Sequence, residues 1–182
     1  MLQAITAFDL SILSAIQQHL RCGILDGIFP ILSQLNNAGF IWIVLSVLLL
    51  CRKKTRTAGI CMVVGLLVNL ALGEGLLKHL FNRTRPFVEQ PIADMLIALP
   101  TTSSFPSGHT SSSFAAATAL FRNNRKAGIA AYVLAVLISF SRLYLYLHYP
   151  TDVLAGAILG FCVGWFATPI VQNKVKQKKL TA

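Results

Sequence analysis

Three short polar segments interrupt a chain that is otherwise mostly apolar, and their side chains are suited to phosphoryl transfer. They are residues 78–86, residues 106–109 and the stretch from Ser141 to Asp152. Together they supply several fixed cations, the carboxylate of Asp152, and the imidazoles of His109 and His148. Cations can hold a phosphoryl group, one imidazole can attack it, and another can protonate the leaving oxygen. Charged side chains beside lipid are costly, so their presence here indicates function.

The composition is that of an integral membrane protein. Of 182 residues, 55% are hydrophobic and only 12% are charged, whereas about a quarter of the residues in a soluble domain are charged. The apolar stretches approach the length of about 20 residues that is needed to cross a bilayer. We therefore expect a single membrane-embedded helical domain over residues 1–182.

The net charge of +10 suggests a nucleic-acid partner, but the distribution of the basic residues argues against one. Eleven of the sixteen Lys and Arg residues lie in three short clusters, at 52–56, 122–126 and 174–179, each beside an apolar stretch and free of acidic residues. Such clusters are typical of cytoplasmic loops under the positive-inside rule. The expected partners are the bilayer and a lipid substrate, not nucleic acid.

The cysteines indicate neither a metal site nor a disulfide framework. Cys22, Cys51, Cys61 and Cys162 are scattered, without a CxxC pair, and each lies in or beside an apolar stretch. Metal-ligand spacing is likewise missing from the polar segments. We expect no metal and no cofactor.

The hydrophobic pattern predicts an all-α polytopic bundle with five or six spans and an amphipathic N-terminal interfacial helix. Residues 1–36 are expected to form interfacial helices, residues 37–172 the transmembrane catalytic bundle, and residues 173–182 a basic cytoplasmic tail. The five clear spans are residues 40–51, 57–77, 111–121, 127–146 and 152–171. Residues 9–35 could add a sixth, although a pair of interfacial helices at the outer face is the favoured interpretation.

These spans place the three basic clusters on one face of the membrane and the three polar segments on the other. If the basic face is cytoplasmic, the polar segments face the extracytoplasmic side of an inner (plasma) membrane. The location of all three polar segments on one face is informative, because each segment alone also has an ordinary structural interpretation. Residues 78–86 could snorkel to headgroups, His109 could lie on the surface behind a helix cap, and His148 could belong to an aromatic belt. Their coincidence on one face favours a catalytic site.

Local features support the same hypothesis. Ser107 can cap the helix that follows it, and Gly108 allows close backbone approach to a ligand. The N-terminus of that helix would offer free N–H groups to a phosphate. Asp152, four residues after His148, can fix the tautomer of the imidazole and raise its basicity.

The order and spacing of these residues resemble the three-part signature of the type 2 phosphatidic acid phosphatase superfamily. The matching residues are Lys78, Arg85 and Pro86; then Pro106, Ser107, Gly108 and His109; then Ser141, Arg142, His148 and Asp152. Nearly every fixed position is filled. The superfamily also contains soluble acid phosphatases and vanadium haloperoxidases, and the membrane spans point to its lipid phosphatase branch.

The resemblance implies a role for each residue. His148 would be the nucleophile that forms a phosphohistidine, Asp152 would orient and activate it, and His109 would be the general acid. The phosphate oxygens would be held by Lys78, Arg85 and Arg142, with help from Ser107 and the Gly108 N–H. This chemistry would need no metal.

Three charged residues outside the signature have open roles. Arg83 could contact a second phosphate, although a solvated position is favoured. Glu74 could pair with a cation of the site or serve packing between helices. Asp9 could cap or charge the first turn of the N-terminal helix.

The expected function is hydrolysis of a phosphate from a lipid phosphate or pyrophosphate at the outer face of the membrane. The short chain, the amphipathic start and the basic loop at residues 121–126 are similar to small undecaprenyl-diphosphate phosphatases, many of which differ at Gly108. Phosphatidylglycerophosphate, phosphatidic acid and lipid A are alternative substrates. Two rival functions are a non-catalytic lipid-binding or lipid-moving protein and a vanadate-dependent oxidant-producing enzyme.

Overall fold

The computed structural model describes residues 2–180, and within that range it contains helices and connecting segments but no strand. In chain order the elements are α1 (Leu2–His19), α2 (Gly23–Leu35), the 3₁₀ turn η1 (Asn37–Gly39), α3 (Phe40–Leu50), α4 (Arg56–Asn69), the π-helical segment η2 (Leu70–Leu77), α5 (Lys78–Phe81), α6 (Pro86–Glu89), α7 (Gly108–Asn123), α8 (Arg125–Tyr144) and α9 (Pro150–Leu180). The all-helical class expected from the sequence is confirmed over these residues.

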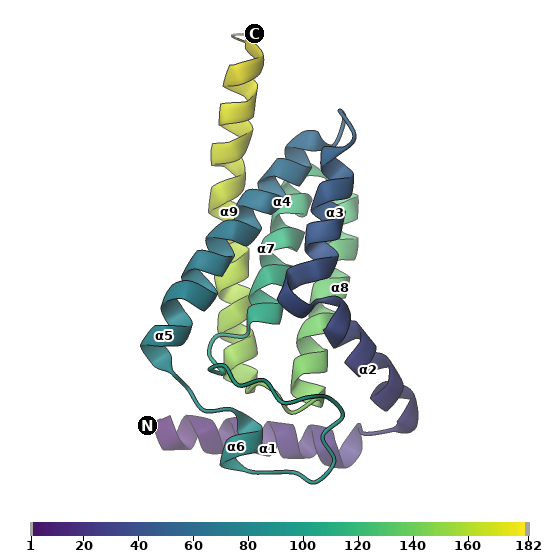
Figure 1. Ribbon diagram of the computed structural model, residues 1–182, viewed down its shortest axis with the longest axis vertical. Helices are drawn as coiled ribbons and strands as arrows, with labels where there is room; N and C mark the ends of the chain where they lie inside the picture. The colour runs from purple at the N-terminus through teal and green to yellow at the C-terminus, as the bar shows by residue number, and fades with distance from the viewer. Residues whose placement is uncertain (1, 181–182) are drawn as a thin grey trace.

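Helix α7 lies at the centre of the bundle, between α4, α8 and α9 (Figure 1). Its core positions are mostly small residues, including the fully buried Ala115, Ala116 and Ala117. The facing side of α9 carries glycines four residues apart, and a Cβ atom at Gly160 would lie 2.2 Å from the Ser111 carbonyl oxygen. Small residues on both helices therefore let the two backbones approach closely, as is common in membrane proteins.

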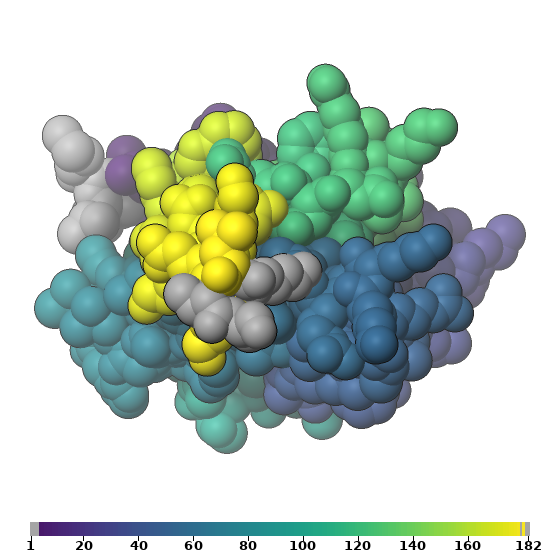
Figure 2. All heavy atoms as spheres, turned by 90° about the horizontal axis from the view of Figure 1, so that it is seen from above, coloured from purple at the N-terminus to yellow at the C-terminus, as the bar shows by residue number. Residues whose placement is uncertain are grey.

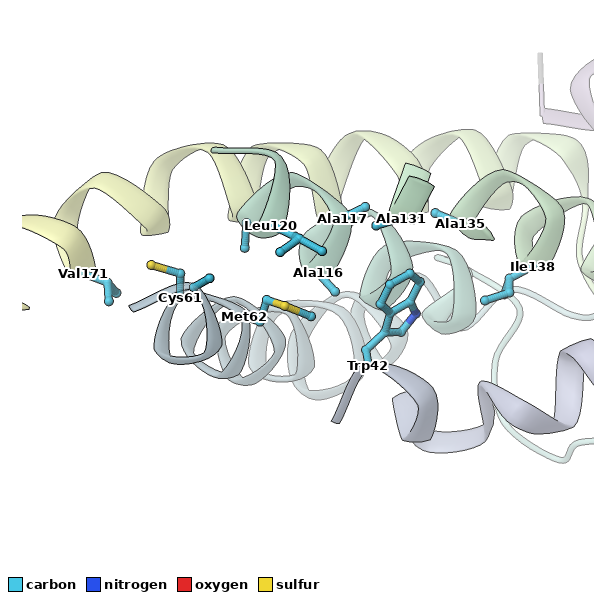
Figure 3. Close-up of a cluster of buried hydrophobic side chains, with 12 residues drawn as sticks. Trp42, Cys61, Met62, Ala116, Ala117, Leu120, Ala131, Ala135, Ile138 and Val171 are labelled. Carbon is cyan, nitrogen blue, oxygen red and sulfur yellow. The ribbon is translucent and has the colours of Figure 1, made fainter. Parts of the chain in front are cut away.

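An apolar cluster beside α7 joins five helices (Figure 3). Trp42 of α3, Met62 of α4, Leu120 of α7 and Ile138 of α8 are buried in it, and Val171 of α9 closes one end. The indole Nε1 of Trp42 donates to Ser113 Oγ on α7 at 2.9 Å, so the one polar atom of this large side chain is satisfied. The cluster fixes α3 and α8 against the central helix.

The outer surface of the bundle carries many exposed apolar side chains, including Leu67, Ile129, Val133 and Phe166. Three segments are long and apolar enough to cross a membrane, namely Arg56–Glu89, Arg125–Tyr144 and Pro150–Lys178. A bent pair, Gly23–Leu35 with Asn37–Leu50, would make a fourth span across a 48° break. The chain is thus a helical membrane protein, with three or four candidate spans by length and composition.

The two ends of the bundle differ in character. The α3–α4 turn, the α7–α8 turn and the C-terminal part of α9 lie at one end, which Figure 2 views directly. All three basic clusters of the sequence fall in these segments. The opposite end carries the α8–α9 turn and the long connection from α6 to α7 (Figure 1). The three polar segments gather at this second end.

Helix α1 lies across the polar end of the bundle, roughly perpendicular to α8 and α9 (Figure 1). Leu13 and Ile16 are buried on its inner face, whereas Ile5 and Phe8 are exposed. Helix α2 does not lie beside α1 but leads into α3 through the bend at η1. Left-handed backbone at Ala38 (φ 51°) and Gly39 (φ 75°) makes this bend, and Ala38 adopts it without the freedom of glycine.

Candidate active site

A cavity of about 1140 Å³ opens at the polar end of the bundle. Its lining contains six of the eight residues that the sequence proposes for the site: Lys78, Arg85, Gly108, His109, Arg142 and His148. The remaining two, Ser107 and Asp152, are fully buried behind this lining. Apolar side chains of α3 and α4, among them Ile43, Val47 and Leu66, line another part of the same cavity.

The polar side chains of the cavity come from the ends of several helices. Lys78 begins α5, Arg85 directly precedes α6, and Gly108 and His109 begin α7. Arg142 lies in the last turn of α8, and His148 lies in the turn between α8 and α9. Because helix ends are where the backbone is free to turn and to expose N–H groups, residues distant in the chain can converge there without disturbing the packed spans.

His148 is 2% exposed, and both nitrogens of its ring have defined neighbours. Its Nδ1 lies 3.7 Å from Asp152 Oδ2 and 3.5 Å from Ser104 Oγ. The Ser104 hydroxyl donates to Asp152 Oδ2 at 2.5 Å, so its oxygen is free to accept from His148. We therefore assign the ring proton to Nδ1, which leaves the Nε2 lone pair directed toward Arg85 Nη1 at 3.3 Å.

Burial keeps the His148 imidazole neutral. Removal from water lowers the pKa of His148 to about 3, and the nearby charges of Arg85 and Arg142 act in the same direction. Asp152 opposes this shift without reversing it. A neutral imidazole with its proton on Nδ1 presents a nucleophilic Nε2 to the cavity, which is what attack on phosphorus requires. Tyr146, two residues earlier, has φ 58°, so strained backbone shapes this turn.

Asp152 is fully buried, and each of its carboxylate oxygens is hydrogen-bonded. Oδ1 accepts from Arg83 Nη1 at 2.6 Å. Oδ2 accepts from Ser104 Oγ at 2.5 Å and from the Tyr149 backbone N–H at 3.0 Å. This many donors hold the carboxylate in one orientation beside His148.

Arg85 and Arg142 enter the cavity with their guanidinium groups held in different ways. The Nε of Arg85 donates to the Thr102 carbonyl at 2.7 Å, and its Nη1 donates to the Leu147 carbonyl at 2.9 Å. Arg142 donates from Nη1 to Ser33 Oγ, whereas its buried Nε has no hydrogen-bond partner among the described residues. A buried guanidinium with a free donor, among the other cations of the cavity, is suited to an anionic ligand.

His109 carries its ring proton on Nε2, because this nitrogen lies 3.1 Å from the Ser33 carbonyl oxygen, which can only accept. Its backbone carbonyl accepts from Ser113 Oγ at 2.7 Å and from Asn36 Nδ2 at 3.0 Å. Residues at the end of α2 thus hold the first turn of α7. The sequence did not reveal that Ser33 would touch both His109 and Arg142.

Ser107 stands at the N-cap position of α7, as the sequence predicts, but its side chain makes no capping bond. Its hydroxyl oxygen accepts from Thr110 Oγ1 at 3.0 Å, and its backbone N–H donates to the Asp152 carbonyl at 3.1 Å. The predicted N-cap position is therefore correct, but the predicted capping hydrogen bond is not formed, because the Ser107 hydroxyl accepts from the Thr110 side chain instead. Ser107 connects the start of α7 to the start of α9.

Glu74 lies directly against the start of α7. A Cβ atom at Gly108 would lie 2.3 Å from Glu74 Oε1, so glycine at this position makes room for the carboxylate. Glu74 Oε2 accepts from Lys78 Nζ at 2.7 Å. Of the two roles left open by the sequence, the pairing with a cation of the site is the one found. Both residues lie on or beside the π-helical η2, a geometry that is frequent at functional sites.

Arg83 is partly buried and ion-paired, so the solvated position that the sequence favoured is wrong. Its guanidinium bridges two fully buried carboxylates, Asp9 on α1 and Asp152 on α9. Asp9 lies in the middle of α1, not in its first turn, and faces the bundle. The sequence did contain an indication that Asp9 faces inward, since Asp9 shares a helical face with Leu13 and Ile16, which are buried.

Among residues 2–180, no group of three or more His, Cys, Asp or Glu side chains is arranged to hold a metal ion.

Sequence comparison finds relatives of this chain. The family model described as PAP2 superfamily matches residues 58–176. The undecaprenyl-diphosphatase of Sulfolobus acidocaldarius is 35% identical over 147 residues, which cover 80% of this chain and 70% of that protein. The undecaprenyl-diphosphatase BcrC of Bacillus subtilis is 30% identical over 146 residues, which cover 78% of this chain and 72% of that protein.

Two solved structures share the fold. The crystal structure of a transmembrane PAP2 type phosphatidylglycerolphosphate phosphatase from Bacillus subtilis superposes with a TM-score of 0.75 at 24% identity, covering 93% of this chain and 87% of that one. The crystal structure of Aquifex aeolicus LpxE has a TM-score of 0.70 at 26% identity, with coverage of 87% and 93%.

Proposed function

Because this chain belongs to the PAP2 superfamily and is a membrane lipid phosphatase, we propose that it removes the terminal phosphate from a polyprenyl diphosphate, with undecaprenyl diphosphate as the favoured substrate. The observation that carries the proposal is the single cavity in which His109, His148 and three cations meet apolar side chains of α3 and α4. Such a cavity can hold a charged headgroup at one part and the start of a hydrocarbon chain at another.

The relatives support a diphosphate substrate. Both of the relatives compared above are named undecaprenyl-diphosphatase. A diphosphate headgroup carries more negative charge than a phosphate monoester, and Lys78 offers a third cation beyond the two guanidinium groups near His148. Phosphatidylglycerophosphate, phosphatidic acid and lipid A phosphates remain alternative substrates within the same chemistry.

In the proposed reaction the terminal phosphate binds between Arg85, Arg142 and the N-terminus of α7, where preorganised positive charge stabilises the charge on the transferred group. His148 Nε2 attacks phosphorus, and the bond from phosphorus to the bridging oxygen breaks. His109 acts in this step as an imidazolium: the bound headgroup delivers a proton to its Nδ1, while the Nε2–H remains on the Ser33 carbonyl. The Nδ1 proton passes to the bridging oxygen, so that the lipid leaves as a monophosphate and His109 is left neutral. The ring of the phosphorylated His148 is now positive, and the carboxylate of Asp152 stabilises it.

The second half of the reaction restores the enzyme. His109, now neutral, accepts a proton from water at its Nδ1, and the water oxygen attacks the phosphohistidine. The bond between phosphorus and Nε2 breaks, inorganic phosphate leaves, and His148 returns to its neutral form. In this scheme the side chains and the N-terminus of α7 supply the charge stabilisation, and no step calls for a metal ion.

The proposed topology has five spans, namely the bent α2–α3 pair, the segment containing α4, and α7, α8 and α9. Helix α7 has 16 residues and is enclosed by other helices, so it need not meet the length or hydropathy of a lipid-exposed span. Helix α1 serves as the interfacial helix, and the end of α9 from residue 173 to residue 180 forms the described part of the basic cytoplasmic tail, whose last two residues lie outside the described range. The basic end of the bundle then faces the cytoplasm, and the cavity faces the extracytoplasmic side of the inner membrane.

A panel assay with purified protein in detergent tests the substrate. Release of inorganic phosphate is measured with undecaprenyl diphosphate, phosphatidylglycerophosphate, phosphatidic acid and a lipid A phosphate. The proposal predicts the highest kcat/KM for undecaprenyl diphosphate. A clear preference for another lipid would replace the substrate but keep the chemistry, whereas no turnover of any lipid would favour the non-catalytic rival.

A further inference from the structure

The catalytic carboxylate is connected to the N-terminal helix through Arg83. Its Nη1 donates to Asp152 Oδ1 at 2.6 Å, and its Nη2 donates to Asp9 Oδ2 at 2.9 Å. Thr151 joins the same network, since its backbone N–H donates to Asp9 Oδ1 at 3.1 Å and its hydroxyl donates to Asp9 Oδ2 at 2.5 Å. The Arg83 guanidinium also lies 3.9 Å from the centroid of the Tyr149 ring.

The charges of this network do not cancel. Asp9 and Asp152 are both fully buried, and the guanidinium of Arg83 is the cation that they share. Two carboxylates and one guanidinium leave one net negative charge, and a buried charge of this kind is costly unless it has a partner. In the resting protein the guanidinium of Arg85 interacts with Asp152, and the ring of His148 adds a further positive charge when it is phosphorylated.

We propose that Asp9 and Arg83 are positioning residues for the phosphatase reaction, and that Asp9 balances the charge of Arg83 so that Asp152 keeps its full negative charge for His148. This inference rests on the proposed function. It makes α1 a part of the catalytic unit, although α1 lies outside the residues 58–176 that the family model matches.

Each charge has a separate effect in this account. Without the charge of Asp9, Arg83 neutralises Asp152, and the positive ring of phosphorylated His148 loses stabilisation. Without Arg83, two buried carboxylates face each other with no shared cation, and Asp152 loses a charge-assisted hydrogen bond. Removal of both charges restores one net negative charge beside His148.

The test is a double-mutant cycle with Asp9→Asn, Arg83→Gln and the double variant, measured as kcat and KM for undecaprenyl diphosphate. Asp9→Asn should lower kcat about tenfold with little change in KM, within the range seen for coupled neighbouring charges. Adding Arg83→Gln to Asp9→Asn should then raise kcat again. A residue pair that only supported folding would instead give a further loss in the double variant.

Two further variants serve as controls. Arg83→Lys keeps the positive charge and should retain much more activity than Arg83→Gln. Asp94→Asn removes an exposed carboxylate of the α6–α7 connection and should leave kcat unchanged. If Arg83→Gln does not accumulate as folded protein, the kcat values of Asp9→Asn and Arg83→Lys are compared instead. The proposal requires a loss of kcat in Asp9→Asn and not in Arg83→Lys.

The inference is overturned if Asp9→Asn retains the kcat of the wild type, or if the double variant is slower than either single variant. Failure of the proposed function is distinguishable, because the wild-type protein would then release no phosphate from undecaprenyl diphosphate.

Discussion

The carboxylate of Glu74 binds Lys78 at 2.7 Å and lies against Gly108 at the start of α7. A helix N-terminus beside a lysine is a binding place for anions, and in this chain a carboxylate already lies there. Glu74 also contributes to the electrostatic environment of Arg85. An incoming phosphate must therefore compete with, or displace, an anion that belongs to the protein.

Substitution of Glu74 should reveal this competition. Glu74→Gln removes the negative charge and leaves Lys78 available, so inorganic phosphate and vanadate should inhibit phosphate release more strongly. The inhibition constant should fall about two- to fivefold, the scale of a partly exposed charge pair. Glu89→Gln, at an exposed glutamate of α6, is the matched control. An inhibition constant that stays the same or rises in Glu74→Gln would contradict this role.

The catalytic activity should depend on the planar guanidinium of Arg142 and not only on its positive charge. Its Nε is buried without a partner among the residues described, and its Nη1 is held by Ser33. Arg142→Gln should lower kcat/KM on the order of 100-fold. Arg142→Lys should recover only part of this loss, because an ammonium group lacks the planar fork. Arg52→Gln at the basic end should keep wild-type kinetics, and a comparable loss there would point to a general effect on folding.

The neutral state of His148 has a consequence for stability. Burial lowers its pKa from 6.5 to about 3, so between these values the unfolded chain binds a proton that the native protein does not. The free energy of unfolding contributed by this group therefore falls as the pH decreases through that window. His148→Asn removes the group, and the variant should lose less stability than the wild type between pH 6 and pH 4, a range of about two units inside the window. Thermal unfolding in detergent measures this, and parallel curves for the two proteins would contradict the assignment.

Close packing of α7 and α9 should depend on glycine. A Cβ atom at Gly160 would lie 2.2 Å from the Ser111 carbonyl oxygen and 2.8 Å from the Ala115 nitrogen, both backbone atoms that cannot move aside. Gly160→Ala should destabilise the protein by about 1–3 kcal/mol or more. Gly27→Ala in α2, where nothing lies within 4 Å, is the control and should be neutral or stabilising. Equal unfolding temperatures for the two variants would contradict the packing seen here.

The sequence was most informative where chemistry depends on residue type. His109, His148 and the three cations could be predicted because ionisable side chains in an apolar chain are conspicuous and their spacing resembles a family signature. Ser33 and Ser104 carried no such signal. Their contacts with His109 and Asp152 span 76 and 48 residues of the chain, so only the tertiary fold brings them to the site.

Charged residues outside the signature were harder to place. Arg83 was expected in solvent because a loop arginine beside a membrane usually is, and the buried partner on α1 could not be inferred from residues 78–86 alone. Asp9 could have been recognised, since a carboxylate on the apolar face of an amphipathic helix needs a partner within the protein. Helix α7 was expected over residues 111–121, and the structure extends it to Gly108–Asn123, with its polar residues buried among other helices.

The most direct test of the account is the identification of the residue that carries the phosphoryl group. Purified protein is mixed with undecaprenyl diphosphate labelled on its terminal phosphate, the reaction is quenched within one turnover under conditions that preserve phosphohistidine, and the labelled peptide is sequenced. The account predicts label on His148, no label and no phosphate release in His148→Ala, and normal folding of that variant. Label on another residue, or phosphate release by His148→Ala at a rate near that of the wild type, would contradict it.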